Sequence, residues 1–232
     1  MNPKQNLNKK IIFNEKIANK TSKLILRTES YVINFDKPKD KWIKLPDGNL
    51  IPCYCNCRYI NSDPKATKII GKYLSDMVKI KFPKVELIVG METAGISWAA
   101  KIASNLDLPF AYARGKSKGY GMGKLIECNP PKHLKTVIID DAYFTGESIL
   151  KAINALKNEL QSNILGIGII VNLSNLENNK NYKKILKHKI SLNSLTDYSF
   201  ILKTLKKKGQ INKDQSNELT EFYNKPQMSI WN

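Results

Sequence analysis

The sequence predicts an α/β fold: a twisted, mostly parallel sheet flanked by helices, with a small hood before it. Apolar runs of strand length alternate along the chain with amphipathic helical patterns, which is typical of parallel sheets covered by helices. The chain has 232 residues, of which 42% are hydrophobic and 25% charged. These values are ordinary for one globular domain with appendages.

Residues 1–60 are expected to form an N-terminal extension and hood, consisting of a helix and a β-hairpin. A lysine-rich helical pattern covers residues 8–28. Two strand-like runs, at 42–45 and 50–57, flank the tetrapeptide Pro46-Asp47-Gly48-Asn49, which is a strong turn signal. We therefore expect the hairpin to precede the main sheet.

Residues 61–232 are expected to form the α/β core, which ends in helices. The apolar spacing predicts helices over residues 61–81, 96–106, 147–160, 197–207 and 213–223. Buried-type strands are predicted over residues 85–89, 109–113, 136–139, 166–173 and 190–195. The polar segment 174–189, rich in Asn and Lys, is expected to be an exposed connection.

The formal net charge is +18, yet its composition argues against a nucleic-acid reader. Only three of the 38 basic residues are arginine, Arg27, Arg58 and Arg114, and the lysines are scattered along the chain. Nucleic-acid readers cluster their charge and use arginine for bidentate base contacts. A lysine-rich, solvated surface is the simpler interpretation, and nucleic acid is an unlikely partner. A positive field would still attract polyanionic small substrates.

The chain is expected to act in the cytoplasm and to have no membrane partner. No apolar run approaches the ~20 residues of a membrane span. The first ten residues lack the apolar core of a signal peptide. Cys53, Cys55 and Cys57 alternate, which predicts that all three lie on one apolar face of a strand. Metal binding there would require a fourth ligand.

The segment Thr136–Leu150 carries the strongest chemical signal. An apolar strand pattern leads into Asp140 and Asp141, and a glycine-containing turn then leads into a helix. Ligands of open α/β sheets bind at the carboxyl ends of strands, and helix N-termini bind phosphate. Two carboxylates can hold ribose hydroxyls or hydrated Mg²⁺. The alternative is an ordinary strand end with capping acids.

Two other loops should reach the same edge of a parallel sheet. Gly90–Gly95 lies between a predicted strand and a predicted helix. Arg114–Gly123 contains four glycines and three basic residues. Such a loop suits a mobile lid that closes over phosphate and excludes water, although a surface loop with compositional lysines would have the same pattern.

These motifs resemble those of type I phosphoribosyltransferases. The stretch IIDDAYFTGES is similar to that family's motif for binding 5-phosphoribosyl 1-diphosphate (PRPP). The stretches ELIVGMETAGISWAAKIA and LPFAYARGKSKGYGMGKLIE are similar to the first pyrophosphate loop and the flexible catalytic loop of orotate phosphoribosyltransferases. The resemblance covers about residues 45–205 and implies the type I phosphoribosyltransferase fold.

The resemblance implies a role for each matching residue. PRPP ribose and 5-phosphate would be bound by Asp140, Asp141, Thr145, Gly146, Glu147 and Ser148. Pyrophosphate would be bound by Thr93, Ala94, Arg114, Lys116 and Lys118. Lys118, Asp140 and Asp141 would be the catalytic residues. Both acids would contact Mg²⁺ through water or substrate. The family's mobile loop reaches the partner's site, which implies a homodimer with shared active sites.

The chain also departs from the family pattern in places that bear on function. Thr93 and Ala94 stand where Tyr-Lys is usual, and Phe144 stands where Thr or Asp is usual. Pro46 occupies the position of a lysine that grips orotate, and the expected arginine after the late strand falls near Asn175. Mg²⁺-dependent transfer of phosphoribose from PRPP to a nitrogenous base is the leading hypothesis. These departures argue for an acceptor other than orotate or for weakened activity. A weakened module that binds PRPP or a nucleotide for regulation is the alternative.

Overall fold

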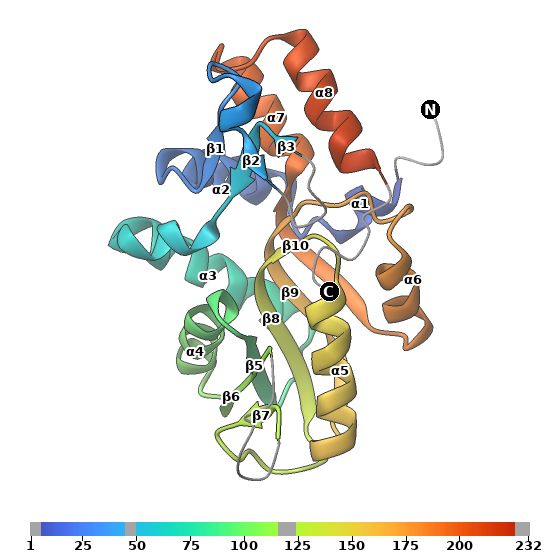
Figure 1. Cartoon of the computed structure of the whole chain (residues 1–232). Helices are drawn as coiled ribbons and strands as arrows, with labels where there is room; N and C mark the ends of the chain where they lie inside the picture. The colour runs from blue at the N-terminus through green and yellow to red at the C-terminus, as the bar shows by residue number, and fades with distance from the viewer. Residues whose placement is uncertain (1–5, 45–49, 116–123, 226–232) are drawn as a thin grey trace.

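The computed structural model describes residues 6–44, 50–115 and 124–225. Its main sheet has six strands in the order β10-β9-β8-β5-β6-β7. All neighbours pair in parallel except β6 and β7, which pair antiparallel. The strands are β5 (Leu87–Met91), β6 (Phe110–Ala113), β7 (Ile126–Glu127), β8 (Lys135–Tyr143), β9 (Asn163–Asn172) and β10 (Ser191–Asp197). The predicted α/β class is confirmed (Figure 1).

Helices cover both faces of this sheet. Alternate residues of each strand point to opposite sides, so apolar side chains on both faces need a covering layer. Val137 and Ile139 of β8 pack in one apolar cluster, whereas Ile138 packs in the other. The first cluster contains residues of α2 (Glu15–Arg27), α3 (Pro64–Lys81), α4 (Ala94–Leu106), α7 (Tyr198–Lys207) and α8 (Lys213–Asn224). The second contains residues of α1 (Asn6–Ile11), α5 (Glu147–Leu160) and α6 (Lys180–Lys187).

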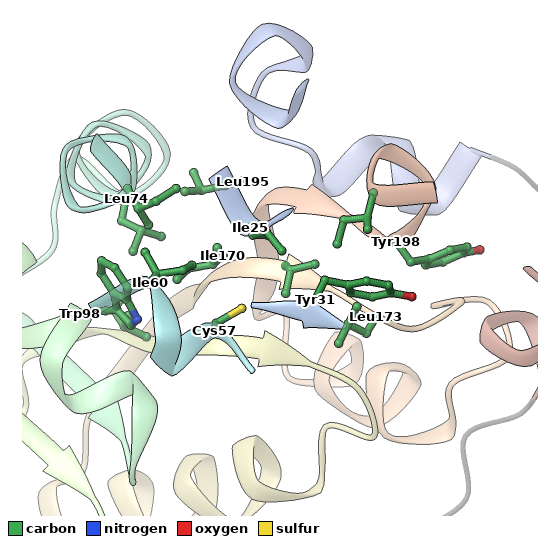
Figure 2. Close-up of a cluster of buried hydrophobic side chains, with 14 of the residues drawn as sticks. Ile25, Tyr31, Cys57, Ile60, Leu74, Trp98, Ile170, Leu173, Leu195 and Tyr198 are labelled. Atoms are coloured by element: carbon green, nitrogen blue, oxygen red, sulfur yellow. The ribbon is translucent and has the colours of Figure 1, made fainter. Parts of the chain in front are cut away.

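The larger cluster is one continuous apolar layer. Figure 2 shows it extending from Trp98 and Leu74, on the helices α4 and α3, past Ile60 and Cys57 to Tyr31. All of these side chains are at most 4% exposed. The layer therefore joins the N-terminal segment to the central sheet and fixes the position of its short strands relative to that sheet.

Four short strands lie in the N-terminal segment. They are β1 (Tyr31–Ile33), β2 (Ile43–Lys44), β3 (Leu50–Ile51) and β4 (Cys53–Cys55). Strand β2 pairs antiparallel with β3, which confirms the predicted hairpin, although its turn lies outside the described residues. Strand β4 instead pairs with β1, so the expected single strand 50–57 is divided between two small sheets. The separation into a hood (1–60) and a core (61–232) remains a proposal.

Several predicted elements were wrong in detail. The single helix expected over 8–28 is two helices, and the break between them lets Asn14 cap α2 through the Ile17 N–H. Cys57 lies in a 3₁₀ helix, Cys57–Ser62, rather than on the strand that holds Cys53 and Cys55. The charged segment 37–41, by contrast, contains a short 3₁₀ turn, Lys39–Lys41, as its turn-like composition predicts.

The segment 174–189 was expected to be an exposed connection, and this was wrong. It contains α6, and the side chains of Leu176, Tyr182 and Ile185 are buried. Its few apolar residues are dispersed among Asn and Lys, so composition does not indicate a helix. Tyr182 and Ile185, spaced i, i+3, nevertheless lie on one helix face and pack in the second cluster. None of the described helices is long and apolar enough to cross a membrane.

Candidate active site

A cleft of about 760 Å³ lies at the carboxyl ends of β5 and β8, beneath the strands of the N-terminal segment. Ligands of open α/β sheets bind at this edge. The described residues that line it are Ile43, Lys44, Ile51, Cys53, Tyr54, Cys55, Asn56, Arg58, Glu92, Thr93, Ala94, Asp140, Asp141, Ala142, Tyr143, Phe144, Thr145, Gly146, Ser148, Ile149, Leu173, Phe222 and Tyr223. The cleft thus brings together two of the three predicted loops.

The two acids stand side by side inside β8, which continues to Tyr143 instead of ending before them. The Asp141 N–H donates to Asp140 Oδ1 at 2.9 Å, and the Ala142 N–H donates to Asp141 Oδ1 at 2.8 Å. These bonds orient both half-buried carboxylates at the cleft. Strands β8 and β9 stay paired beyond the two acids, since Ala142 is in register with Val171 of β9.

Confinement raises the pKa of both carboxyl groups. Desolvation is the largest cause for each, and for Asp140 the charge of Asp141 adds to it. Arg58 works in the opposite direction, because its positive charge lowers the pKa of Asp141. Ionisation of both carboxyl groups is therefore costly at this place, and a nearby cation or hydroxyl donor would favour it.

The N-termini of α4 and α5 flank the acids and differ from those of the longer helices elsewhere in the described chain. The helices α2, α3, α6, α7 and α8 each have an Asn or Asp that caps their first turn. Thr93 and Gly146, the N-cap residues of α4 and α5, make no such side-chain hydrogen bond. Uncapped N–H groups and the helix dipole favour an anion. Two helix N-termini without a side-chain cap thus border one acid pair.

The turn before α5 is held in shape by its neighbours. Gly146 has φ of 77°, and a Cβ there would collide with the buried ring of Tyr143. Asn179 and Asn181 donate their side-chain amides to the carbonyls of Phe144 and Thr145, at 2.9 and 3.0 Å. These two asparagines come from the segment that was expected to be an exposed connection, so composition alone concealed their role.

A close approach also fixes α4 against β8. A Cβ on Gly95 would clash with the carbonyl oxygen of Ile139 and lie 3.1 Å from the Asp140 Cα. The start of α4 therefore lies directly against the strand that carries the acids. Thr93 and Ala94, predicted for pyrophosphate, are at the cleft as a result.

Two described residues of the predicted site, Glu147 and Arg114, are not among the lining residues of the cleft. The Glu147 carboxylate pairs with Lys151 Nζ at 3.1 Å along α5, which directs it away from the α5 N-terminus. The Arg114 guanidinium lies 3.5 Å from the Glu127 carboxylate on β7. The backbone of Gly115 continues toward the cleft, where its N–H donates to Glu92 Oε2 at 2.7 Å. Lys116 and Lys118 lie outside the described residues.

Several lining residues were missed by sequence reasoning. Arg58 reaches the cleft because Cys57–Ser62 forms a 3₁₀ helix over β8 rather than a strand. Phe222 and Tyr223 come from α8, more than 70 residues after the acids along the chain. Their helical pattern was recognised, but a helix period does not reveal which distant strand edge the helix covers.

The donor chemistry fits Mg²⁺ bound mainly by substrate. Within the described residues no group of three or more His, Cys, Asp or Glu side chains could enclose a metal ion. Mg²⁺ often binds through one or two carboxylates together with substrate phosphates and water. Asp140 and Asp141 supply the two carboxylates.

Comparison with known proteins identifies the family. The pattern of the phosphoribosyl transferase domain matches residues 59–205. The chain belongs to the phosphoribosyltransferase family. Orotate phosphoribosyltransferases of Bacillus cereus and Bacillus anthracis are 34% identical to it over 184 residues, which cover 79% of this chain and 86% of theirs. The resemblance found in the motifs is thus confirmed, and this phosphoribosyltransferase is most readily compared with the orotate enzymes.

Solved structures show the same phosphoribosyltransferase fold. The orotate phosphoribosyltransferase from Aeropyrum pernix has a TM-score of 0.68 and 22% identity, and covers 82% of this chain and 99% of its own. The UMP synthase of Leishmania donovani has a TM-score of 0.69 and 19% identity, and covers 89% of this chain and 42% of its own. At these identities the likeness supports the fold alone.

Proposed function

We propose that this phosphoribosyltransferase carries out Mg²⁺-dependent transfer of the phosphoribosyl group from PRPP to a nitrogenous base. A base nitrogen bonds to C1 of the ribose and gives up its proton to solvent, while the C1–O bond to pyrophosphate breaks and pyrophosphate leaves with that electron pair. The observation that carries the proposal is the pair of uncapped helix N-termini beside two adjacent carboxylates in one cleft. PRPP has anionic groups at both ends of a sugar, which matches this arrangement.

The 5-phosphate is assigned to the N-terminus of α5. Backbone N–H groups around Gly146 and Ser148 would donate to it, aided by the helix dipole. Thr145 is 8% exposed and shapes the turn, and the Glu147 N–H donates to Thr145 Oγ1 at 3.4 Å. The Glu147 side chain plays no direct part in this assignment, since it is paired with Lys151.

The ribose hydroxyls are assigned to Asp140 and Asp141, which would accept their hydrogen bonds. Mg²⁺, when bound, would supply positive charge to the pyrophosphate oxygens, and the same two carboxylates would hold its water shell. Both carboxylates line the cleft beside the two helix N-termini, which supports this assignment.

The pyrophosphate is assigned to the N-terminus of α4, with Thr93 and Ala94, and to the loop that follows Arg114. Lys118 would neutralise the leaving group, with Lys116 and Arg114 adding to the positive field. The Glu92 contact with Gly115 N–H connects the start of this loop to the same cleft.

We propose an acceptor other than orotate. Pro46 and Asn175 stand where cations would grip a carboxylated pyrimidine. In the structure the Asn175 side chain donates to Asn224 Oδ1 at 3.0 Å, so it serves the end of α8. The relatives are orotate phosphoribosyltransferases, and their substrate does not decide the acceptor of this chain.

A catalytically weakened module that binds PRPP or a nucleotide is the second candidate. The specific observation that favours it is the first loop, which presents Glu92, Thr93 and Ala94 to the cleft without a cation. A homodimer with shared active sites and a cytoplasmic location remain proposals as well.

Pyrophosphate release from PRPP and Mg²⁺ across a panel of bases tests the proposed function. Asp140→Ala combined with Asp141→Ala should abolish PRPP binding, and Lys118→Ala should slow turnover strongly. Lys132→Ala, an exposed lysine remote from the cleft lining, is the matched control. Unchanged pyrophosphate release in both the acid and Lys118 variants would contradict the proposal. PRPP binding without turnover would favour the regulatory module.

A further inference from the structure

Helix α8 lies beyond the segment matched by the family pattern, which ends at residue 205, yet it forms part of the cleft. Phe222 and Tyr223 stand in its last turn and line the cavity. Figure 1 shows α8 on the same side of the molecule as β1, β2 and β3. The cleft therefore has a wall that the transferase motifs alone do not account for.

This wall is held rigidly by hydrogen bonds at the end of the helix. Asn224 Oδ1 accepts from the Asn175 side-chain amide at 3.0 Å and from the Tyr198 hydroxyl at 3.1 Å. The Asn178 side-chain amide donates to the Asn224 carbonyl at 2.7 Å. Tyr223 is 3% exposed, and its hydroxyl lies 2.8 Å from the Tyr31 hydroxyl. A wall fixed by the segment after β9, by α7 and by Tyr31 of β1 can shape a ligand at low entropic cost.

The wall offers an aromatic surface next to the acid pair. The rings of Phe144 and Phe222 stack with centroids 6.1 Å apart and planes 17° apart. Phe144 follows Asp141 by three residues on the same strand end, so this surface adjoins the position assigned to the ribose. Ile51, Cys53 and Leu173 complete an apolar end of the cleft, and each is at most 8% exposed.

Charge at the cleft disfavours an anionic acceptor at this end. The described acids that line it are Glu92, Asp140 and Asp141, and the described cations are Lys44 and Arg58, both exposed. The positive charge of Arg58 lowers the pKa of Asp141. The other described cation of the lining, Lys44, lies in β2. The polar groups of the apolar end stay neutral, because burial raises the pKa of Cys53 to about 11. A carboxylate placed against Ile51, Cys53 and Leu173 would lose water, and these three side chains offer it no charged partner.

We propose that α8 is the element that selects the acceptor: Phe222, stacked on Phe144, forms the surface on which a planar, uncharged nitrogenous heterocycle lies beside the ribose. This inference rests on the proposed transfer of phosphoribose, because that reaction requires a base next to C1. It assigns specificity to residues 222 and 223, outside the motifs that bind PRPP.

The test compares uracil with orotate, which carry the same ring without and with a carboxylate, together with adenine and hypoxanthine. The full chain is assayed for pyrophosphate release at saturating PRPP and Mg²⁺. An uncharged base should have the higher kcat/KM. Phe222→Ala should raise the KM for that base roughly 5- to 100-fold, as expected for loss of one base–aromatic stacking contact, and leave the KM for PRPP unchanged.

Two further variants guard against a folding defect. Phe222→Leu keeps most of the buried volume but removes the ring, and it should also raise the acceptor KM. Glu218→Ala, an exposed change on the same helix, should change neither KM.

Some outcomes would overturn the inference without contradicting the proposed function. Preferred use of orotate, or an acceptor KM that is the same in Phe222→Ala and the wild type, would refute it while transfer stands. If no base releases pyrophosphate, the proposed function fails instead. Calorimetry of uracil and adenine binding to wild type and Phe222→Ala then decides the inference, since equal affinities would refute it and weaker binding by the variant would support it.

Discussion

Substitution of Gly146 by alanine examines the turn on which the proposed phosphate site depends. This residue has φ of 77°, where a side chain costs about 1–2 kcal/mol. Its Cβ would also meet the ring of Tyr143, with Cζ at 2.6 Å and Cε2 at 2.8 Å, and the clash with the hydroxyl is closer still. Overpacking of this kind costs about 1–3 kcal/mol. We therefore expect a total loss of about 2–5 kcal/mol of unfolding free energy.

The chain offers a matched control for the backbone part of this cost. Gly209 has φ of 67°, and nothing lies within 4 Å of a Cβ built on it. Gly209→Ala should therefore show only the conformational cost of about 1–2 kcal/mol. Urea unfolding of both variants gives the difference, which reports the collision with Tyr143. Adding Tyr143→Phe to Gly146→Ala should recover part of that difference, because the closest clashing atom is removed.

The same variants link the turn to function. Gly146→Ala should raise the KM for PRPP, because displacing the turn moves the first N–H groups of α5 away from the 5-phosphate. Gly209→Ala should leave this KM unchanged. Equal stability losses in the two variants, with equal KM for PRPP, would refute the close packing of Gly146 on Tyr143 as the basis of the site.

Three further predictions concern charge. Asp140→Asn should raise the melting temperature at about pH 8 more than at about pH 4. The raised pKa of Asp140 lets the folded wild type hold a proton that the unfolded chain loses, so wild-type stability falls as pH rises through that range. Equal gains in melting temperature at the two pH values would contradict this. Arg58→Ala should shift the acidic limb of the kcat/KM profile to higher pH, because Arg58 lowers the pKa of Asp141; an unmoved limb would count against it. Glu147→Gln should change the KM for PRPP by less than about twofold, since the Glu147 carboxylate pairs with Lys151. A large fall in this KM would show that the carboxylate repels the phosphate and therefore lies beside it.

Much of the fold and the centre of the site could be predicted from local sequence. The helix α5 was predicted with its observed bounds, Glu147–Leu160, because a strong apolar period and a preceding glycine mark it. Asp140, Asp141, Thr145, Gly146 and Ser148 lie together at the cleft because they are neighbours in one strand–turn–helix unit. Proximity in sequence guarantees such groupings.

The remainder depends on contacts between distant segments, and local patterns do not encode these. Arg58 reaches the cleft because it lies in the 3₁₀ helix Cys57–Ser62, and Phe222 reaches it from the last described helix. Asn179 appeared to belong to a polar linker, yet it is fully buried and holds the phosphate turn. The partner of Glu147 also had to come from the structure, because an i, i+4 lysine is an option and not an obligation.

The most direct test of the account is base-dependent pyrophosphate release from PRPP and Mg²⁺, measured side by side for the wild type and for Asp140→Ala combined with Asp141→Ala. The account predicts release by the wild type that requires both Mg²⁺ and a base, and no release by the double variant. A wild type that binds PRPP but releases no pyrophosphate with any base, or a double variant as active as the wild type, would contradict it.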